Sequence, residues 1–230
     1  MASHDPWKNP PLKEALFEIR FQPVSDYAIF VGGIAASLHE KFPYTEKLEA
    51  AEIPHFIQFE GVARHRFFSQ DRAFAFQTGF DVVSVHVIAY SGFAAFSKTI
   101  RDVLDCAQKF VAFEGISRLG VRYINVFDEP KDLFGSLNIT PPFSSMEIDK
   151  TEEVLLKLVK REQEDITVNT TVSLSSNNNK SLFLDIDAFY NPSNIKWDID
   201  LILSWISKAH DVVYENFDSL VSLPEKGERK

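Results

Sequence analysis

Hydrophobic and polar residues alternate along several stretches of the chain, and the longest of these runs from Ile116 to Phe127. Successive side chains of a strand point to opposite faces. One face of this stretch is therefore apolar, while Arg118 and Arg122 share the other face, four residues apart. The pattern predicts a long strand near the centre of a sheet. Guanidinium groups on such a strand need anionic partners or water.

The same alternation predicts further strands on both sides of this one. They are residues 12–21, 55–61, 64–69, 73–79, 81–89, 166–175 and 181–189. The short connections between neighbouring strands indicate antiparallel pairing. Residues 151–164 suit either a helix or a strand, and the strands that follow them favour a strand. Thr45–Pro54 carries mixed charge and is expected to form a loop.

Three other stretches repeat their apolar residues at helical spacing. We expect them to begin at Ser25, Ser91 and Asn194, since short polar side chains cap helix N-termini. Gly32-Gly33 weakens the first helix by about 1 kcal/mol per glycine relative to alanine, so either another element packs closely there or the helix bends. Together the elements predict an α+β fold, in which a curved, mainly antiparallel sheet, in one body or two lobes, is covered by three main helices.

The elements also suggest how the chain is divided. Residues 1–11 are rich in proline and predict an extended lead-in. Residues 12–222 are expected to form a single α+β domain. A lobe boundary is placed at 138–150, where two prolines follow one another in a polar stretch. Residues 223–230 form a charged tail.

Composition is that of a soluble globular protein, with 230 residues of which 45% are hydrophobic and 25% charged. The net charge of −9 disfavours nucleic acid or an anionic membrane as the main partner. No apolar run is long enough to span a bilayer, and no signal-peptide core is seen, so a cytoplasmic location is expected. The single cysteine, Cys106, falls on an apolar helical stripe and is expected to be an inert core thiol.

Asp185 and Asp187 are the sharpest chemical feature of the sequence, because two carboxylates at alternate positions of a strand share one face. They could hold Mg²⁺ or Mn²⁺ with water and a substrate phosphate. Alternatively, one carboxylate pairs with an arginine while the other begins the turn that follows. We favour this structural interpretation, since two carboxylates alone make a poor magnesium site.

Arg118 and Arg122 could grip a phosphate or carboxylate ligand in fork geometry. Alternatively, they neutralise acidic residues on neighbouring strands, either Asp185 and Asp187 or the pair Glu14 and Glu18. We favour neutralisation, because buried charges normally occur in pairs.

Glu14, Glu18 and Arg20 are similar to the charged strand of triphosphate tunnel enzymes, which carries Glu-X-Glu-X-Lys. Leu16 and Arg20 depart from that pattern, so the tunnel interpretation is not favoured. None of the six histidines has the spacing of a metal-binding motif. His210 lies beside the apolar stripe of the last helix and is expected to be a packed residue.

Three segments resemble a sporadically distributed family of uncharacterised prokaryotic proteins. They are NPPLKEALFEIRF at residues 9–21, RLGVRYIN at 118–125 and LDIDAF at 184–189. The resemblance extends over nearly the whole chain and implies a single folded unit. That family has no assigned activity, so the resemblance implies no catalytic residues.

Our first hypothesis is therefore a soluble binding or interaction module without catalytic activity, whose partner is a protein. In it Arg118, Arg122, Asp185 and Asp187 form a charge network near a cleft. One alternative is a metal-dependent enzyme acting on a phosphorylated or nucleotide substrate through Asp185 and Asp187, with Arg122 holding the phosphate. Another is a sensor that binds a small anion or nucleotide through the two arginines. No cofactor is predicted.

Overall fold

A computed structural model of the chain forms two compact units. It describes residues 11–52, 59–111, 113–128, 137–138, 153–175, 181–193 and 195–221. Unit 1 comprises Met1–Lys13, Arg122–Ala188 and Lys208–Lys230, and unit 2 comprises Glu14–Val121 and Phe189–Ser207.

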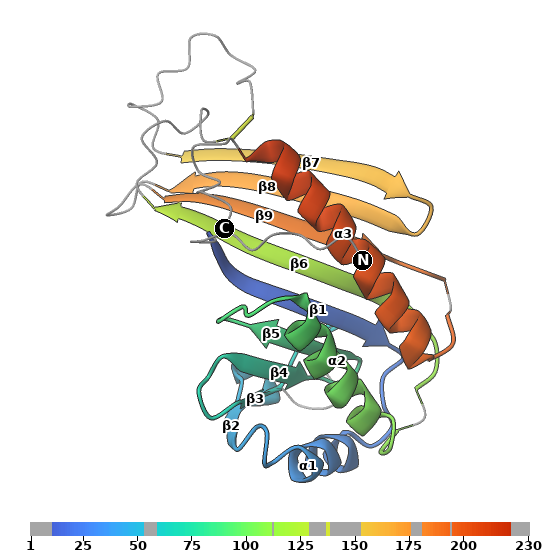
Figure 1. The fold of residues 1–230 in the computed structure, drawn as a ribbon. Helices are drawn as coiled ribbons and strands as arrows, with labels where there is room; N and C mark the ends of the chain where they lie inside the picture. The colour runs from blue at the N-terminus through green and yellow to red at the C-terminus, as the bar shows by residue number, and fades with distance from the viewer. Residues whose placement is uncertain are drawn as a thin grey trace. The chain divides into compact units, whose positions relative to one another are not determined.

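The described residues form an antiparallel sheet and three α-helices (Figure 1). The strands are β1 (Leu12–Phe21), β2 (Tyr44–Lys47), β3 (His65–Phe68), β4 (Phe74–Thr78), β5 (Val82–Val87), β6 (Ile116–Asp128), β7 (Glu153–Gln163), β8 (Ile166–Ser175) and β9 (Ser181–Tyr190). The helices are α1 (Tyr27–Ser37), α2 (Phe93–Ala107) and α3 (Ile199–Leu220). The nine strands follow the order β2-β3-β4-β5-β1-β6-β9-β8-β7. The predicted α+β class, with three helices packed on an antiparallel sheet, is confirmed.

In unit 2, alternation along β1 decides which residues enter the core. Ala15, Phe17, Ile19 and Phe21 are buried, as the sequence pattern predicts. The register between β1 and β5 sets Phe17 opposite Val85, and β4 continues this row with Phe76. The apolar face of the sheet is thus built from matching positions on adjacent strands.

Helices α1 and α2 belong to the core of unit 2. The ring of Phe42, which follows α1, packs edge-on against Phe76 on β4 at a centroid distance of 4.9 Å. Tyr27 at the start of α1 points its hydroxyl at Thr78 and donates to the Thr78 carbonyl oxygen over 2.9 Å. Burial raises the pKa of Tyr27 to about 12, so this phenol stays a neutral donor. Cys106 on α2 is buried, and burial raises its thiol pKa, in line with the expected core role.

Gly33 marks the place where a second element packs against α1. A Cβ at Gly33 would overlap the ring of Phe110, which follows α2, whereas a Cβ at Gly32 would meet nothing within 4 Å. Of the two alternatives for the glycine pair, close packing therefore accounts for Gly33.

In unit 1, β7 and β8 form an antiparallel hairpin. Within the ambiguous stretch 151–164, Glu153–Gln163 adopts the strand alternative. The apolar face of β8 and β9 is buried at Val168, Leu174, Leu182, Leu184 and Ile186. From α3, His210 approaches β6, where its Nδ1 lies 2.8 Å from the Tyr123 hydroxyl. His210 is thus a packed, hydrogen-bonded residue, as expected.

Several local predictions are wrong. Asp26, rather than Ser25, caps α1 by accepting from the Ile29 N–H over 3.1 Å, and Gly92, rather than Ser91, precedes α2 without a side-chain cap. Within the stretch expected to be a loop, β2 and a 3-10 helix at Glu49–Glu52 form. These errors have two causes. Neighbouring Ser/Asp and Ser/Gly pairs offer competing caps, and a four-residue strand is specified by its partner strand.

The last helix also starts later than expected. Asp198 accepts hydrogen bonds from the N–H groups of Asp200 and Leu201 over 3.0 Å each, which caps α3 at Ile199. Asn194, the predicted cap, lies outside the described residues. So do 55–58 of the predicted strand 55–61, nearly all of the proposed lobe boundary at 138–150, and the tail. No helix in the described part of the chain is both long and apolar enough to cross a membrane.

The glycine pair in α1 provides a matched test of packing. We expect Gly33→Ala to lower the free energy of unfolding by about 1–3 kcal/mol, because the new methyl group must displace the Phe110 ring. Gly32→Ala should raise it, by up to about 1 kcal/mol, because alanine favours the helix. Chemical denaturation of both variants measures the difference. Equal effects of the two substitutions would contradict the close approach of Phe110.

Candidate functional site

A row of polar residues crosses the sheet in unit 2 on the face opposite its apolar core. The strand register places these five positions in line: Glu46 on β2, Arg66 on β3, Gln77 on β4, Ser84 on β5 and Glu18 on β1. We call them the polar row. Four of the five come from strands whose other face is buried and apolar, so alternation places the whole row on one surface.

Direct contacts connect the polar row. Arg66 lies 3.8 Å from a carboxylate oxygen of Glu46. When the Gln77 amide is oriented with its oxygen toward Arg66, that oxygen accepts two bonds of 3.0 Å from the guanidinium and one of 3.1 Å from His86 Nε2. Gln77 is buried, and these bonds satisfy an amide that would otherwise be desolvated without compensation.

Ser84, His86 and Glu14 have the connectivity of an acid–histidine–serine triad. Ser84 Oγ lies 3.0 Å from His86 Nε2, and His86 Nδ1 lies 2.6 Å from Glu14. Two observations argue against a nucleophilic role. With the Gln77 amide oriented as above, its oxygen accepts from Nε2, and in that arrangement Nε2 is not free to act as a base toward Ser84. Ser84 is only 5% exposed, on a strand paired on both sides, so the surrounding backbone N–H groups are not available to stabilise an oxyanion.

Arg118 on β6 meets acidic Glu18 rather than an aspartate. Its Nε lies 3.3 Å from Glu18 Oε1, and the same oxygen accepts from Arg20 Nε over 2.8 Å. The guanidinium of Arg118 also stacks over the Phe189 ring, 4.8 Å from its centroid, and Nη1 lies 3.4 Å from Asn191 Oδ1. One carboxylate therefore serves two arginines.

Arg122 forms a two-point contact with Asp185 in unit 1. Nε donates to Oδ1 over 2.7 Å and Nη2 donates to Oδ2 over 2.5 Å. This is the fork geometry in which a guanidinium binds a carboxylate most strongly. Asp187, two residues along β9, is half-buried on the same face. Among the described residues, no group of three or more His, Cys, Asp or Glu side chains could hold a metal ion.

Six of the seven residues singled out from the sequence fall into three groups. Glu18, Arg20 and Arg118 form one cluster, and Arg122 with Asp185 forms an ion pair. Glu14 pairs instead with His86, a residue to which the sequence analysis assigned no role. Arg118 and Arg122 on β6 thus each have an acidic partner, and Arg122 binds its partner at two points.

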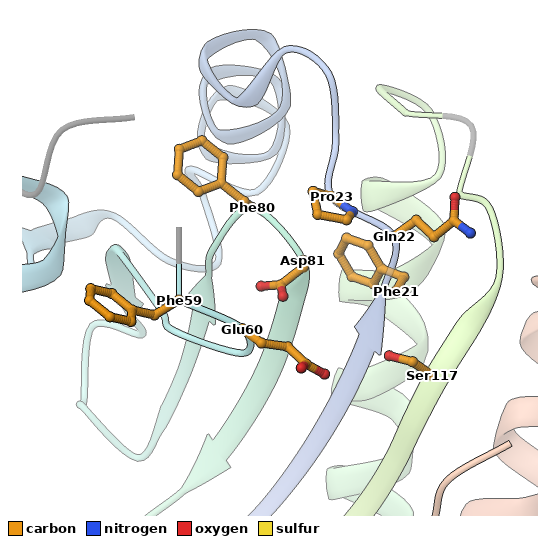
Figure 2. Close-up of a pocket in the computed structure, with 8 residues that line it drawn as sticks. All are labelled: Phe21, Gln22, Pro23, Phe59, Glu60, Phe80, Asp81 and Ser117. Atoms are coloured by element: carbon orange, nitrogen blue, oxygen red, sulfur yellow. The ribbon is translucent and has the colours of Figure 1, made fainter. Parts of the chain in front are cut away.

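A pocket of about 370 Å³ lies elsewhere in unit 2, at the end of β1 (Figure 2). Its lining residues come from four separate segments of the chain. They are Phe21, Gln22, Pro23, Phe59, Glu60, Phe80, Asp81 and Ser117. Figure 2 shows the carboxylates of Glu60 and Asp81 between the rings of Phe59 and Phe80 on one side and Phe21 on the other. Among the described residues, the lining therefore combines aromatic rings with two acidic groups and includes no basic side chain.

Asp81 is held firmly in this pocket. Its two carboxylate oxygens accept from the Gly61 N–H over 3.1 and 3.0 Å. Asp81 is only 7% exposed, and burial raises the pKa of its carboxyl, with a smaller contribution in the same direction from Glu60. The Gly61 N–H and the more distant Arg20 oppose that rise. An added cation would relieve the same electrostatic penalty.

The backbone at Gly61 requires glycine. Its φ is +69°, and a Cβ there would overlap the guanidinium of Arg20. Only glycine adopts this conformation without strain and leaves room for that side chain. Arg64 stacks over the ring of the lining residue Phe80, 4.3 Å from its centroid. These arginines border the pocket but are not among its lining residues.

Sequence analysis missed this pocket. Its signal is a repeated combination at strand ends, Phe59-Glu60-Gly61 and Gly79-Phe80-Asp81, in which a ring and an acid adjoin a glycine. Such a pattern also suits ordinary turns, so it becomes informative only when both turns are known to lie together.

Comparison with known proteins adds no assignment. A scan against protein-family models found no match to the chain, and a search of curated proteins found none either.

The ion pair of Arg122 and Asp185 should be energetically coupled. We expect a double-mutant cycle with Arg122→Gln and Asp185→Asn to give a coupling of about 1 kcal/mol, since a two-point, partly buried pair exceeds a typical surface pair. The measurement is chemical denaturation of the wild type, both single variants and the double variant.

The matched control is Arg101 with Asp200, an exposed pair joined by one bond of 2.7 Å. Its cycle should show a smaller coupling than that of Arg122 and Asp185. Additive effects of Arg122→Gln and Asp185→Asn would show that the two side chains do not act as a pair.

Proposed function

We propose that this chain is a non-catalytic interaction module whose pocket receives a lysine or arginine side chain of a protein partner. One observation carries the proposal: carboxylates of Glu60 and Asp81 lie among the rings of Phe21, Phe59 and Phe80 in one cavity. Such a lining suits a cationic head on an apolar stem, because the stem covers the rings while the head approaches the acids.

The size and setting of the pocket support a side chain as its occupant. A volume of about 370 Å³ is at the lower end for small-ligand sites. Phe59 at the rim is 59% exposed, and an exposed aromatic ring is a common anchor at protein interfaces. The net charge of −9 favours encounter with a basic partner over an acidic one.

The contacts of the other candidate groups give less support to the alternative functions. Asp185 is already bound at both oxygens by Arg122, so metal coordination there would first have to break an ion pair. Arg118 shares Glu18 with Arg20, so an anion would have to compete with a carboxylate already in place. Both alternatives remain predictions that require a ligand to displace an existing partner.

The proposal is tested with single blocked amino acids. We expect a blocked lysine amide to shift the backbone amide resonances of Gly61 and Ser117 saturably in an NMR titration. The Gly61 N–H is a direct reporter, because it donates to the Asp81 carboxylate. The blocked norleucine amide, which keeps the apolar stem and lacks the charge, should bind at least about tenfold more weakly, a difference of about 1.4 kcal/mol.

Variants separate the pocket from general charge attraction. Asp81→Asn and Glu60→Gln should each weaken binding of the lysine amide, whereas Glu40→Gln, at an exposed position after α1, should leave it unchanged. Equal binding of lysine and norleucine amides, or equal loss in all three variants, would contradict the proposal. Binding of a small amine without any binding of lysine-containing peptides would show a small-molecule site instead.

Binding should also depend on pH through Asp81. Because burial raises its pKa above the ordinary 3.8, affinity for the lysine amide should be full above that raised value. It should fall as the pH drops through it, since the cation prefers the ionised carboxylate. Glu60 and Arg20 are the charged groups that face the same carboxyl. The measurement is the titration repeated across pH, and Asp81→Asn should flatten the profile.

The stability of the unliganded protein should change with pH in the opposite direction. The folded state holds the Asp81 proton more tightly than the unfolded state does, so this group lowers the free energy of unfolding as pH rises from about 3.8 through the raised pKa. A profile of unfolding free energy that is identical in the wild type and Asp81→Asn would contradict the raised pKa.

A further inference from the structure

Strand β7 is a long edge strand. Among the described residues it is the last strand in the order of the sheet and pairs only with β8 (Figure 1). It spans 11 residues, Glu153–Gln163. An edge of this length presents a row of backbone N–H and C=O groups that can pair with another strand.

Apolar side chains on both faces of β7 are open to solvent. Leu155 is 66% exposed and Val159 56% exposed on one face, and Leu158 is 63% exposed on the other. Native proteins usually protect an edge with charges, short length or a bulge. β7 carries two lysines and a register shift near Arg161, yet three large apolar residues remain uncovered. This combination indicates an interaction surface.

The sequence of β7 is complementary to itself in one antiparallel register. If Lys157 lies opposite Lys157 of a second copy, the remaining pairs are Glu153 with Arg161, Val154 with Lys160, Leu155 with Val159, and Leu156 with Leu158, each occurring twice. Opposite charges then face each other, and exposed apolar residues cover each other. The two lysines at the axis are the unfavourable feature of this register.

Neighbouring registers lack this complementarity. Placing Leu158 opposite itself sets Leu155 against Arg161 and Lys157 against Val159. Placing Leu156 opposite itself leaves Glu153 against Val159. Only registers that shift the pairing by an even number of residues are compared, because a shift of one residue would turn every side chain to the opposite face of the sheet.

We propose that β7 pairs with β7 of a second copy, antiparallel and with a two-fold axis at Lys157, so that the sheet continues across two chains. A two-fold axis is the usual symmetry of a homodimer, and it repeats each favourable pair. A single strand pair covers less area than a standard interface. The dimer should therefore be weak and depend on protein concentration.

The first test uses charge reversal. In sedimentation equilibrium over a wide concentration range, the wild type should associate to a dimer. Glu153→Arg and Arg161→Glu should each weaken the dimer by about tenfold or more, since each creates two like-charged pairs. The double variant that exchanges both charges should restore association. Glu40→Arg, at an exposed position that is not part of β7, serves as the control and should not change the dimer.

The second test uses the axis itself. Lys157→Cys should form a disulfide-linked dimer on mild oxidation, because residues opposite each other in an antiparallel pair lie within disulfide reach. Val159→Cys, on the same face, lies opposite Leu155 and should form far less of it. The native Cys106 is buried and does not interfere.

Three results would overturn the proposed dimer or its register. A wild-type chain that stays monomeric at every concentration overturns the proposal. A dimer that is insensitive to both reversals, or Val159→Cys cross-linking as readily as Lys157→Cys, overturns this interface and its register. Thermal denaturation of each variant shows that the fold is retained, which these exposed positions lead us to expect.

Discussion

The polar face of the sheet in unit 2 depends on one constraint: its charged and polar side chains must pair with side chains on adjacent strands, and the strand register decides which ones meet. Alternation sends every second residue of β1, β3, β4 and β5 to a face that carries Glu18, Arg66, Gln77 and Ser84, while the other face is an apolar core. A shift of one residue in any strand would exchange these faces. The hydrogen bonds among Arg66, Gln77 and His86 therefore hold the same register that the core requires, and the two faces specify each other.

The sequence predicts that the arginines need acidic partners better than it predicts which acidic residues those partners are. Alternation and buried-charge arguments led to acidic partners for Arg118 and Arg122, and the structure pairs them with Glu18 and Asp185 respectively. Which acid meets which arginine depends on the order of strands, and that order is set by contacts between distant segments. Glu14 illustrates the limit, because its partner His86 lies on β5, and no local pattern indicates that β5 borders β1. Elements with strong periodicity were predicted well, whereas helix ends failed where two capping residues adjoin, as at Ser25 and Asp26.

The pocket was harder to foresee, because none of its parts is unusual alone. Phe59, Glu60 and Gly61 precede β3, while Phe80 and Asp81 connect β4 to β5. The two hydrogen bonds from Gly61 to Asp81 join these segments, and the positive φ of Gly61 leaves space for Arg20. Arg20 thereby links the pocket to the charge cluster, since it also donates to Glu18. Asp81 is buried, and no basic residue is among the described lining residues, so its carboxylate would gain from a cation. This is why the pocket suggests binding rather than only packing.

The two edges of the sheet are treated differently, and the difference follows from their sequences. At one edge β2 has four residues, including Glu46 and Lys47, and the Arg72 guanidinium lies 6.0 Å from the Tyr44 ring centroid. Shortness and charge are two of the devices that protect an edge from pairing. At the other edge β7 is 11 residues long and exposes Leu155, Leu158 and Val159. The same chain thus protects the edge at β2 and leaves the edge at β7 apolar, so exposed apolar residues are specific to β7. The apolar residues of β7 are therefore better explained by a strand that covers them than by tolerance of an exposed edge.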